Sequence, residues 1–210
     1  MKFKRHKQLG FTLAEMAIVV VLGGILLAAG LMAGRGQISR AQAQDVMQIA
    51  TDLQSASLSF KQRYGYLPGD WLYAASQLPN VIASPGNGDG LIAGTMTAAG
   101  LAQANSEVQD APVHLYQAGL IGKMGTNPLM RMQSQFGAVH IAVANAANTS
   151  AAYLLANPAV RNVIIFFNLP CEVVLDVDRA LDDGVDTSGR AMGIAACTAG
   201  GSLTRYFVPL

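Results

Sequence analysis

Hydrophobic and polar positions alternate in two different ways over the first third of the chain. Every residue from Met16 to Gly34, a run of nineteen, is apolar or glycine, and none is charged. An α-helix needs about 20 such residues to cross the hydrocarbon core of a bilayer. This run therefore predicts a membrane-spanning helix.

The following stretch is amphipathic. Spacings of three, four and seven residues dominate its apolar positions, and Gln, Ser, Asp and Arg lie between them. This pattern is typical of a helix that packs one face. No proline precedes Pro68, so we expect one helix from Phe11 to about Tyr64. The expected core positions are Ile38, Ala41, Val46, Ile49, Leu53, Leu58 and Phe60.

Glycine and proline end this helix in the segment YGYLPGDW, where we expect Trp71 to belong to the core. The later segment SPGNGDGLI (84–92) predicts a glycine-rich turn. It has only a weak likeness to a calcium-binding loop, because no acidic residue closes it. Residues 110–122 predict a helix with Asp110 as its cap and with Val113, Tyr116, Leu120 and Ile121 towards the core. We expect His114, on this helix, to lie at the surface or half-buried.

The last third of the chain predicts strands and one further helix. Residues 138–144 and 162–169 are rich in β-branched and aromatic side chains, as strands are. Residues 169–184 predict a helix with Val174, Val177 and Leu181 on one face, and TRYFVPL (204–210) predicts an edge strand.

Charge is unevenly distributed. The net charge is +1, but four of the fourteen basic residues precede Gly10. Loss of residues 1–10 would change the net charge to −3, before the new terminal amine is counted. Basic residues ahead of an apolar run place the amino end in the cytoplasm and the rest of the chain outside. A cleaved secretory signal and a plain membrane anchor are the competing interpretations.

Glu15 distinguishes these interpretations, because a carboxylate at a membrane-buried helix position costs roughly 2.5–3.5 kcal/mol and usually has a partner. Cleavage after Gly10 would create such a partner, since Phe11 would gain a terminal ammonium group. In an assembly of parallel helices, Glu15 of one copy would pair with the amino terminus of a neighbour.

The segment GFTLAE, with its basic leader and the apolar run behind it, resembles the prepilin peptidase site of type IV pilins and type II secretion pseudopilins. The resemblance implies cleavage between Gly10 and Phe11 and N-methylation of Phe11. It assigns Thr12, Leu13 and Glu15 to the processing and assembly segment. The stretches YGYLPGD and 177–184 also resemble segments of pseudopilin-like proteins, with Arg179 where those proteins have lysine.

The resemblance implies an α+β, pilin-like fold, in which a long amino-terminal helix packs against an antiparallel sheet with loop and helix insertions. Residues 1–10 are then the leader, 11–34 the transmembrane and assembly helix, 35–64 the stem helix, and 65–210 a periplasmic globular domain. The implied partners are other pilin or pseudopilin subunits, the prepilin peptidase and the inner-membrane assembly platform. The length of the chain favours a minor subunit.

Cys171 and Cys197 are the only cysteines, and neither has metal-site spacing. Outside the cytoplasm a disulfide is the default expectation, and two buried thiols are the alternative. The nearby carboxylates Asp178, Asp182, Asp183 and Asp186 are weak candidates for calcium, which some major pseudopilins bind in a carboxy-terminal loop. A solvated acidic turn, in which Asp182 and Asp183 cap backbone amides, is the favoured interpretation.

Catalytic motifs are missing from the sequence: there is no GxSxG, HExxH, phosphate loop or dinucleotide fingerprint. Together with the resemblance, this absence leads us to expect a structural filament subunit rather than an enzyme. We expect no cofactor, and calcium is the one weak candidate. Two alternatives remain open, a membrane-anchored periplasmic binding protein and a DNA-binding minor pilin of an uptake system. Scattered basic residues make nucleic-acid binding the weaker of these.

Overall fold

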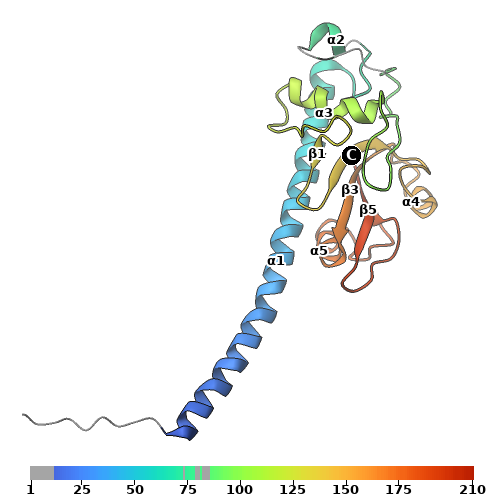
Figure 1. Cartoon of the computed structure of the whole chain (residues 1–210). Helices are drawn as coiled ribbons and strands as arrows, with labels where there is room; N and C mark the ends of the chain where they lie inside the picture. Colours follow the sequence, from blue (N-terminus) through green and yellow to red (C-terminus); the bar gives the residue numbers. More distant parts are fainter. Residues whose placement is uncertain (1–11, 73, 79–80, 82–85) are drawn as a thin grey trace, which may run out of the picture. The chain divides into compact units, whose positions relative to one another are not determined.

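The computed structural model describes residues 12–72, 74–78, 81 and 86–210 of the chain (Figure 1). The chain divides into two compact units, Met1–Ser39 and Arg40–Leu210. Helix α1 (Leu13–Tyr64) runs through both and contains 52 residues.

The part of α1 in the first unit leaves its apolar side chains uncovered. Val20 and Leu26 are each 73% exposed, and Ile18 is 59% exposed. Gly23, Gly24 and Gly30 do not interrupt the helix.

The part of α1 in the second unit supplies one side of a hydrophobic core. The buried positions follow each other at intervals of three and four residues, which is one face of a helix: Ala43, Val46, Ala50, Leu53, Ala56 and Phe60. The expected stripe is therefore only partly correct. Ile38, Ala41 and Leu58 are exposed, and Ile49 is half-buried. Val46, Leu53 and Phe60 are buried as expected, and alanines occupy the other positions of the packed face.

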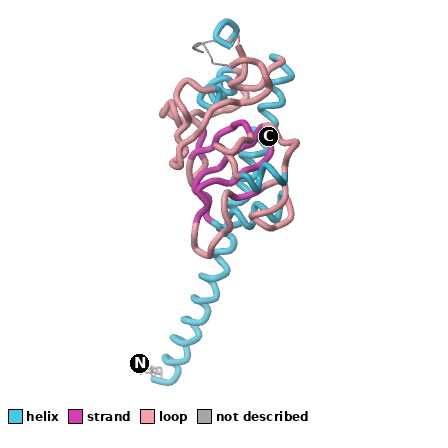
Figure 2. Tube along the Cα trace, turned by 90° about the vertical axis from the view of Figure 1, so that its right-hand side faces the viewer, coloured by secondary structure: helices cyan, strands magenta, loops and turns pink. Residues whose placement is uncertain are grey.

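The rest of the second unit contains short helices and one antiparallel sheet (Figure 2). The sheet order is β1-β2-β3-β5-β4. The elements after α1 are α2 (Ala74–Gln77), α3 (Glu107–Gln117), β1 (Met132–Gln133), β2 (Ala138–Val143), α4 (Ala151–Ala156), β3 (Asn162–Pro170), α5 (Cys171–Leu181), β4 (Met192–Gly193) and β5 (Ser202–Pro209). This is the α+β, pilin-like architecture that the sequence predicts.

Both faces of the sheet are covered. Tyr206 donates a hydrogen bond to Asp178 of α5 at 2.8 Å, while the ring of Phe207 lies 5.4 Å from that of Tyr153 in α4. Successive strand residues point to opposite faces, so α5 and α4 lie on opposite sides of β5. This explains why β3, next to β5, is buried along almost its whole length.

Two expectations about the sheet and its helices are wrong in detail. The last strand, β5, is not an edge, because the two-residue β4 pairs with it at Phe207 and Tyr206. In α5, Val174 and Val177 are buried as expected, whereas Leu181 at the last turn is 43% exposed. A helix end that extends past the sheet leaves its last apolar residue uncovered.

Helix α3 also differs from the prediction. It begins at Glu107 with Ser106 as its N-cap, not at Asp110, and Pro112 lies within it. Its buried face contains Val108, Ala111 and Leu115, while Tyr116 is exposed. The buried positions 108, 111 and 115 lie three and four residues apart on one face of the helix, which excludes Tyr116. The helix ends at Gln117, so the predicted core positions Leu120 and Ile121 lie beyond it.

Candidate functional site

The processing site predicted at Gly10 and Phe11 lies outside the described residues, but the segment after it is described. Thr12 precedes the first helical residue, Leu13, and Glu15 lies in the first turn. The Thr12 amide and hydroxyl each donate to Glu15 Oε2 at 2.8 Å, and the Glu15 amide donates to Thr12 Oγ1 at 3.2 Å. Both side chains therefore satisfy amides at the start of α1 that have no partner within the helix.

This reciprocal arrangement is a capping box, which places Thr or Ser at the N-cap and Glu three residues later. The spacing of Thr12 and Glu15 in GFTLAE contains this signal, but sequence reasoning assigned Glu15 to contacts between subunits only. In the isolated chain its carboxylate has a local role as well, because it fixes the first turn of the assembly helix.

The helix behind this cap is the one segment of the described residues long and apolar enough to cross a membrane, Leu13–Gly30. None of that window is buried within the protein, which distinguishes it from the core helix of a soluble domain. Apolar area of this size is not left in water by a stable monomer. Lipid or neighbouring helices must cover it, so the segment fits a membrane anchor.

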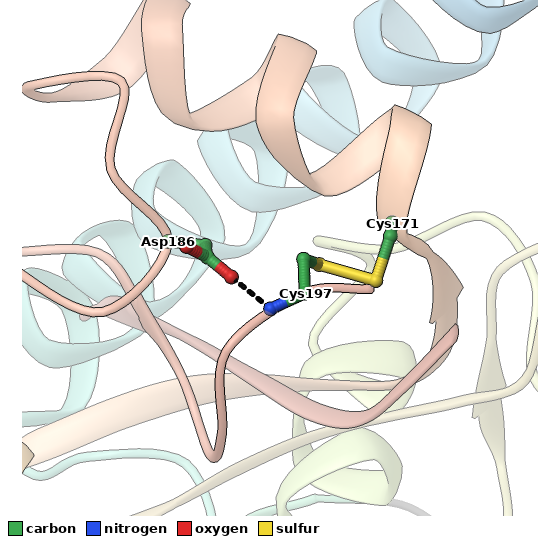
Figure 3. The surroundings of a disulfide bond; sticks show 3 residues. All are labelled: Cys171, Asp186 and Cys197. Carbon is green, nitrogen blue, oxygen red and sulfur yellow. Dashed lines mark hydrogen bonds between the residues drawn. A yellow bond between two sulfur atoms is a disulfide. The ribbon is translucent and has the colours of Figure 1, made fainter. Parts of the chain in front are cut away.

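The second unit contains the disulfide. Cys171, the first residue of α5, is bonded to Cys197 in the loop between β4 and β5 (Figure 3). The Cys171 amide donates to the Gly201 carbonyl at 2.9 Å, and the Cys197 amide donates to the Asp186 carboxylate. The bridge therefore fastens the loop that leads into β5 to the start of α5.

The acidic residues considered for calcium already accept hydrogen bonds from the chain itself. Asp182 accepts from the amides of Arg190 and Ala191, and Asp183 accepts from the Val185 amide and the Ser188 hydroxyl. Asp178 is fully buried, and burial raises the pKa of its carboxyl. Among the described residues no group of three or more His, Cys, Asp or Glu is placed to hold a metal ion. Calcium binding stays a prediction.

Two other carboxylates, which sequence reasoning did not single out, hold the glycine-rich loop. Asp70 accepts from the amides of Gly88 and Gly90 at 2.6 and 2.7 Å. Glu107 accepts from the amides of Asn87 and Ala93 at 3.3 and 2.6 Å. Burial raises the pKa of Glu107 to about 7, and the nearby Asp70 adds to the effect.

His114 is fully buried, contrary to the expectation of a surface or half-buried side chain. Its Nδ1 accepts from the Gly69 amide at 2.8 Å, and burial lowers the pKa of its imidazole to about 4. The glycine at the end of the YLPG turn supplies the amide. Gly69 and His114 are 45 residues apart in the sequence, so helical periodicity alone cannot reveal their contact.

One large groove lies in the second unit between the α1 segment around Leu58, the loop after α4 and the end of β5. Its volume is about 860 Å³. The lining includes the apolar residues Leu58, Leu67, Ala159 and Pro209, and the three cationic residues Lys61, Arg161 and Arg190. A groove of this size can hold a small molecule or a short segment of polypeptide.

Comparison with known proteins gives one positive result. Residues 5–31 match the family model described as the prokaryotic N-terminal methylation motif. No curated protein and no solved structure matches the chain. The match begins among the basic residues at the amino end and ends one residue past the Leu13–Gly30 window, so it includes the predicted processing site, Glu15 and the membrane-compatible segment. The chain therefore carries, on an α+β pilin-like fold, the N-terminal methylation motif that is characteristic of type IV pilins and pseudopilins.

Proposed function

We propose that the chain is a structural subunit of a type IV pilus or a type II secretion pseudopilus. In this proposal the prepilin peptidase cleaves it after Gly10, Phe11 is methylated, and the inner-membrane assembly platform incorporates it through its amino-terminal helix. The amino end lies in the cytoplasm before processing, and the second unit lies in the periplasm. The observation that carries the proposal is the match at residues 5–31, which covers the whole exposed apolar window Leu13–Gly30.

Physical chemistry supports assembly through this helix. In a filament, neighbouring helices would cover the side chains of Leu13–Gly30 that are exposed in the single chain. Tight packing replaces lipid contacts at little cost, and glycines such as Gly23 and Gly30 allow helices to approach closely. Glu15 would then exchange part of its local capping for the charged amino terminus of an adjacent copy.

Isolation of filaments from cells that produce the full-length chain tests the proposal. Replacement of Glu15 by Ala or Gln is expected to leave the protein in the membrane fraction and to remove it from sheared filaments. Met16→Ala is the matched control, since Met16 lies in the same turn, carries no charge and has no assigned role in processing or assembly. Incorporation of the Glu15 variants at the parental level would contradict the assembly role of Glu15.

A further inference from the structure

The groove of the second unit has an unbalanced charge. The side chains of Lys61, Arg161 and Arg190 are exposed around it, and no acidic side chain belongs to its lining. The carboxylate of Leu210, which also lines the groove, offsets one of these three charges. Among the described residues the one ion pair joins Arg179 to Asp176, outside the groove. The guanidinium of Arg161 has only a long hydrogen bond, 3.4 Å, to the carbonyl of Asp89. We call this site the basic groove.

The basic groove also presents groups that an occupant would satisfy. Leu58 is 58% exposed although it lies within the second unit, and Pro158 and Ala159 are exposed across from it in the lining. Ser57 is 2% exposed, and its hydroxyl has no hydrogen-bond partner among the described residues. A buried hydroxyl without a partner is destabilising, so a ligand that accepts from it is favoured.

A segment of the same chain has the complementary character. Residues 181–187, which we call the acidic segment, contain three aspartates and no basic residue. Two apolar side chains lie among the carboxylates, Leu181 at 43% exposure and Val185 at 48%. The amides of Val185 and Ala191 donate hydrogen bonds to the carboxylates of Asp183 and Asp182, which orders this segment before binding, so binding would cost little ordering entropy.

The acidic segment does not fill the basic groove of its own chain. None of its residues belongs to the lining, and Asp182 is held by the amides of Arg190 and Ala191. We propose that the basic groove binds the acidic segment of a second copy of the chain. The inference rests on the proposed function, because a filament brings copies of the second unit side by side.

This contact joins two different surfaces, so it is heterologous, and repetition of it generates a ring or a helical array. The filament proposed above needs an array of that kind. Self-contact also implies a subunit that repeats along the filament, which differs from the minor subunit that chain length favours. Exposed ion pairs contribute up to about 1 kcal/mol each, so this contact is weak and sensitive to salt.

Chemical cross-linking between two differently tagged full-length chains in the same membranes tests the inference. One copy carries Leu58→Cys in the basic groove and the other carries Val185→Cys in the acidic segment. A short bis-maleimide joins them, and the native disulfide keeps Cys171 and Cys197 from reacting. Tyr116→Cys on α3 replaces Val185→Cys as the control, because Tyr116 is similarly exposed at 42% and lies outside both surfaces.

We expect about fivefold more product between the tagged copies with Val185→Cys than with Tyr116→Cys. Arg161→Glu in the groove copy is expected to remove most of that difference, as is salt at molar concentration. Equal yields for the two cysteines would overturn the inference and assign the groove to another occupant.

The same samples separate this inference from the proposed function when Glu15→Ala is introduced into both copies. Filaments that depend on Glu15 but give no Val185 product would leave the filament role intact and overturn the contact. A Val185 product without any filament would support the contact and contradict the filament role. Absence of both filaments and product in copies that keep Glu15 would overturn both proposals, whereas their joint loss in the Glu15→Ala copies is the expected result.

Discussion

The two halves of α1 have the same backbone conformation but differ in what covers their side chains. In the first half Ile18, Val20 and Leu26 are mostly exposed, and in the second half Val46 and Phe60 are fully buried. The first half is apolar around its whole circumference, and the second half has one narrow apolar face. A helix of the first kind needs a surrounding apolar medium, while one of the second kind needs a single partner.

We infer from this difference that folding and the proposed assembly depend on different parts of the chain. The second unit contains its own core, built from the α1 face, the sheet and the short helices. The Leu13–Gly30 segment contributes nothing to that core. Substitutions in the two halves are therefore expected to affect different measurements.

The largest expected difference is between Phe60→Ala and Ile18→Ala. Phe60 is fully buried and its ring lies 5.7 Å from that of Trp71, so its truncation is expected to cost about 3–5 kcal/mol of unfolding free energy. Ile18 is 59% exposed and does not belong to the core, so its truncation should change that free energy by less than about 0.5 kcal/mol. Urea unfolding of the detergent-solubilised chain, followed by backbone circular dichroism, measures both. Equal losses would show that the halves fold as one unit.

The disulfide is expected to have the next largest effect. Its cysteines are 26 residues apart, and opening a loop of that size costs about 3 kcal/mol in the chain-entropy model. The double variant Cys171→Ser, Cys197→Ser should lose this amount in urea unfolding. Amide exchange should become faster over α5 and β5 and stay unchanged over Leu13–Gly30. Faster exchange over Leu13–Gly30 would show that the two halves of α1 do not unfold independently.

Glu107 makes the stability of the second unit depend on pH. Its pKa is about 7 in the folded chain against an ordinary 4.5, so the folded state holds the proton more tightly. Its contribution is full below pH 4.5 and is lost as the pH rises to 7, by at most about 3 kcal/mol. Glu107→Gln is expected to flatten this fall between pH 4.5 and 7, at an overall cost, because both carboxylate oxygens accept amides.

His114 has the opposite effect on how the stability of the second unit changes with pH. Its pKa of about 4 lies below the ordinary 6.5, so stability is lost as the pH falls through this window. The two contributions partly cancel between pH 4.5 and 6.5 in the parent chain. A parallel offset of the Glu107→Gln curve, with an unchanged slope, would contradict the assignment to Glu107.

The smallest expected effect concerns the capping box of the first half. Thr12→Ala removes the oxygen that accepts from the Glu15 amide, and loss of an N-cap costs about 1 kcal/mol. Exchange of that amide should quicken about fivefold in micelles, while unfolding of the second unit stays unchanged. Thr12→Ser keeps the oxygen and should exchange like the parent. Faster exchange in Thr12→Ser would point to lost packing of the Thr methyl group instead.

Local signals predicted a large part of the fold. The apolar run, the absence of proline before Pro68 and the breakers after Tyr64 predicted α1, and β-branched residues predicted β2 and β3. The cysteine pair that the sequence suggested is joined in the structure. Each of these signals lies within a short window or depends on the only two residues of their kind.

The remaining features depend on contacts between distant residues. Asp70 precedes the 87–93 loop in the sequence and Glu107 follows it, yet both accept hydrogen bonds from its amides. His114 accepts from the Gly69 amide, 45 residues away. Strand β4 has only two residues, too few for any alternation, so β5 was expected at an edge. The capping box is different, because it depends on two residues only three positions apart. The spacing of Thr12 and Glu15 is visible in the sequence, but its role in capping α1 was not predicted.

The central claim is that the amino-terminal segment is a prepilin processing and assembly signal. Intact mass and amino-terminal peptide mapping of the membrane-extracted protein, compared with Gly10→Ala, test it most directly. If the segment is a prepilin signal, the parent chain begins at N-methylated Phe11 and the Gly10→Ala variant stays uncut. A parent chain that keeps residues 1–10, or one cut after the apolar run, would contradict it.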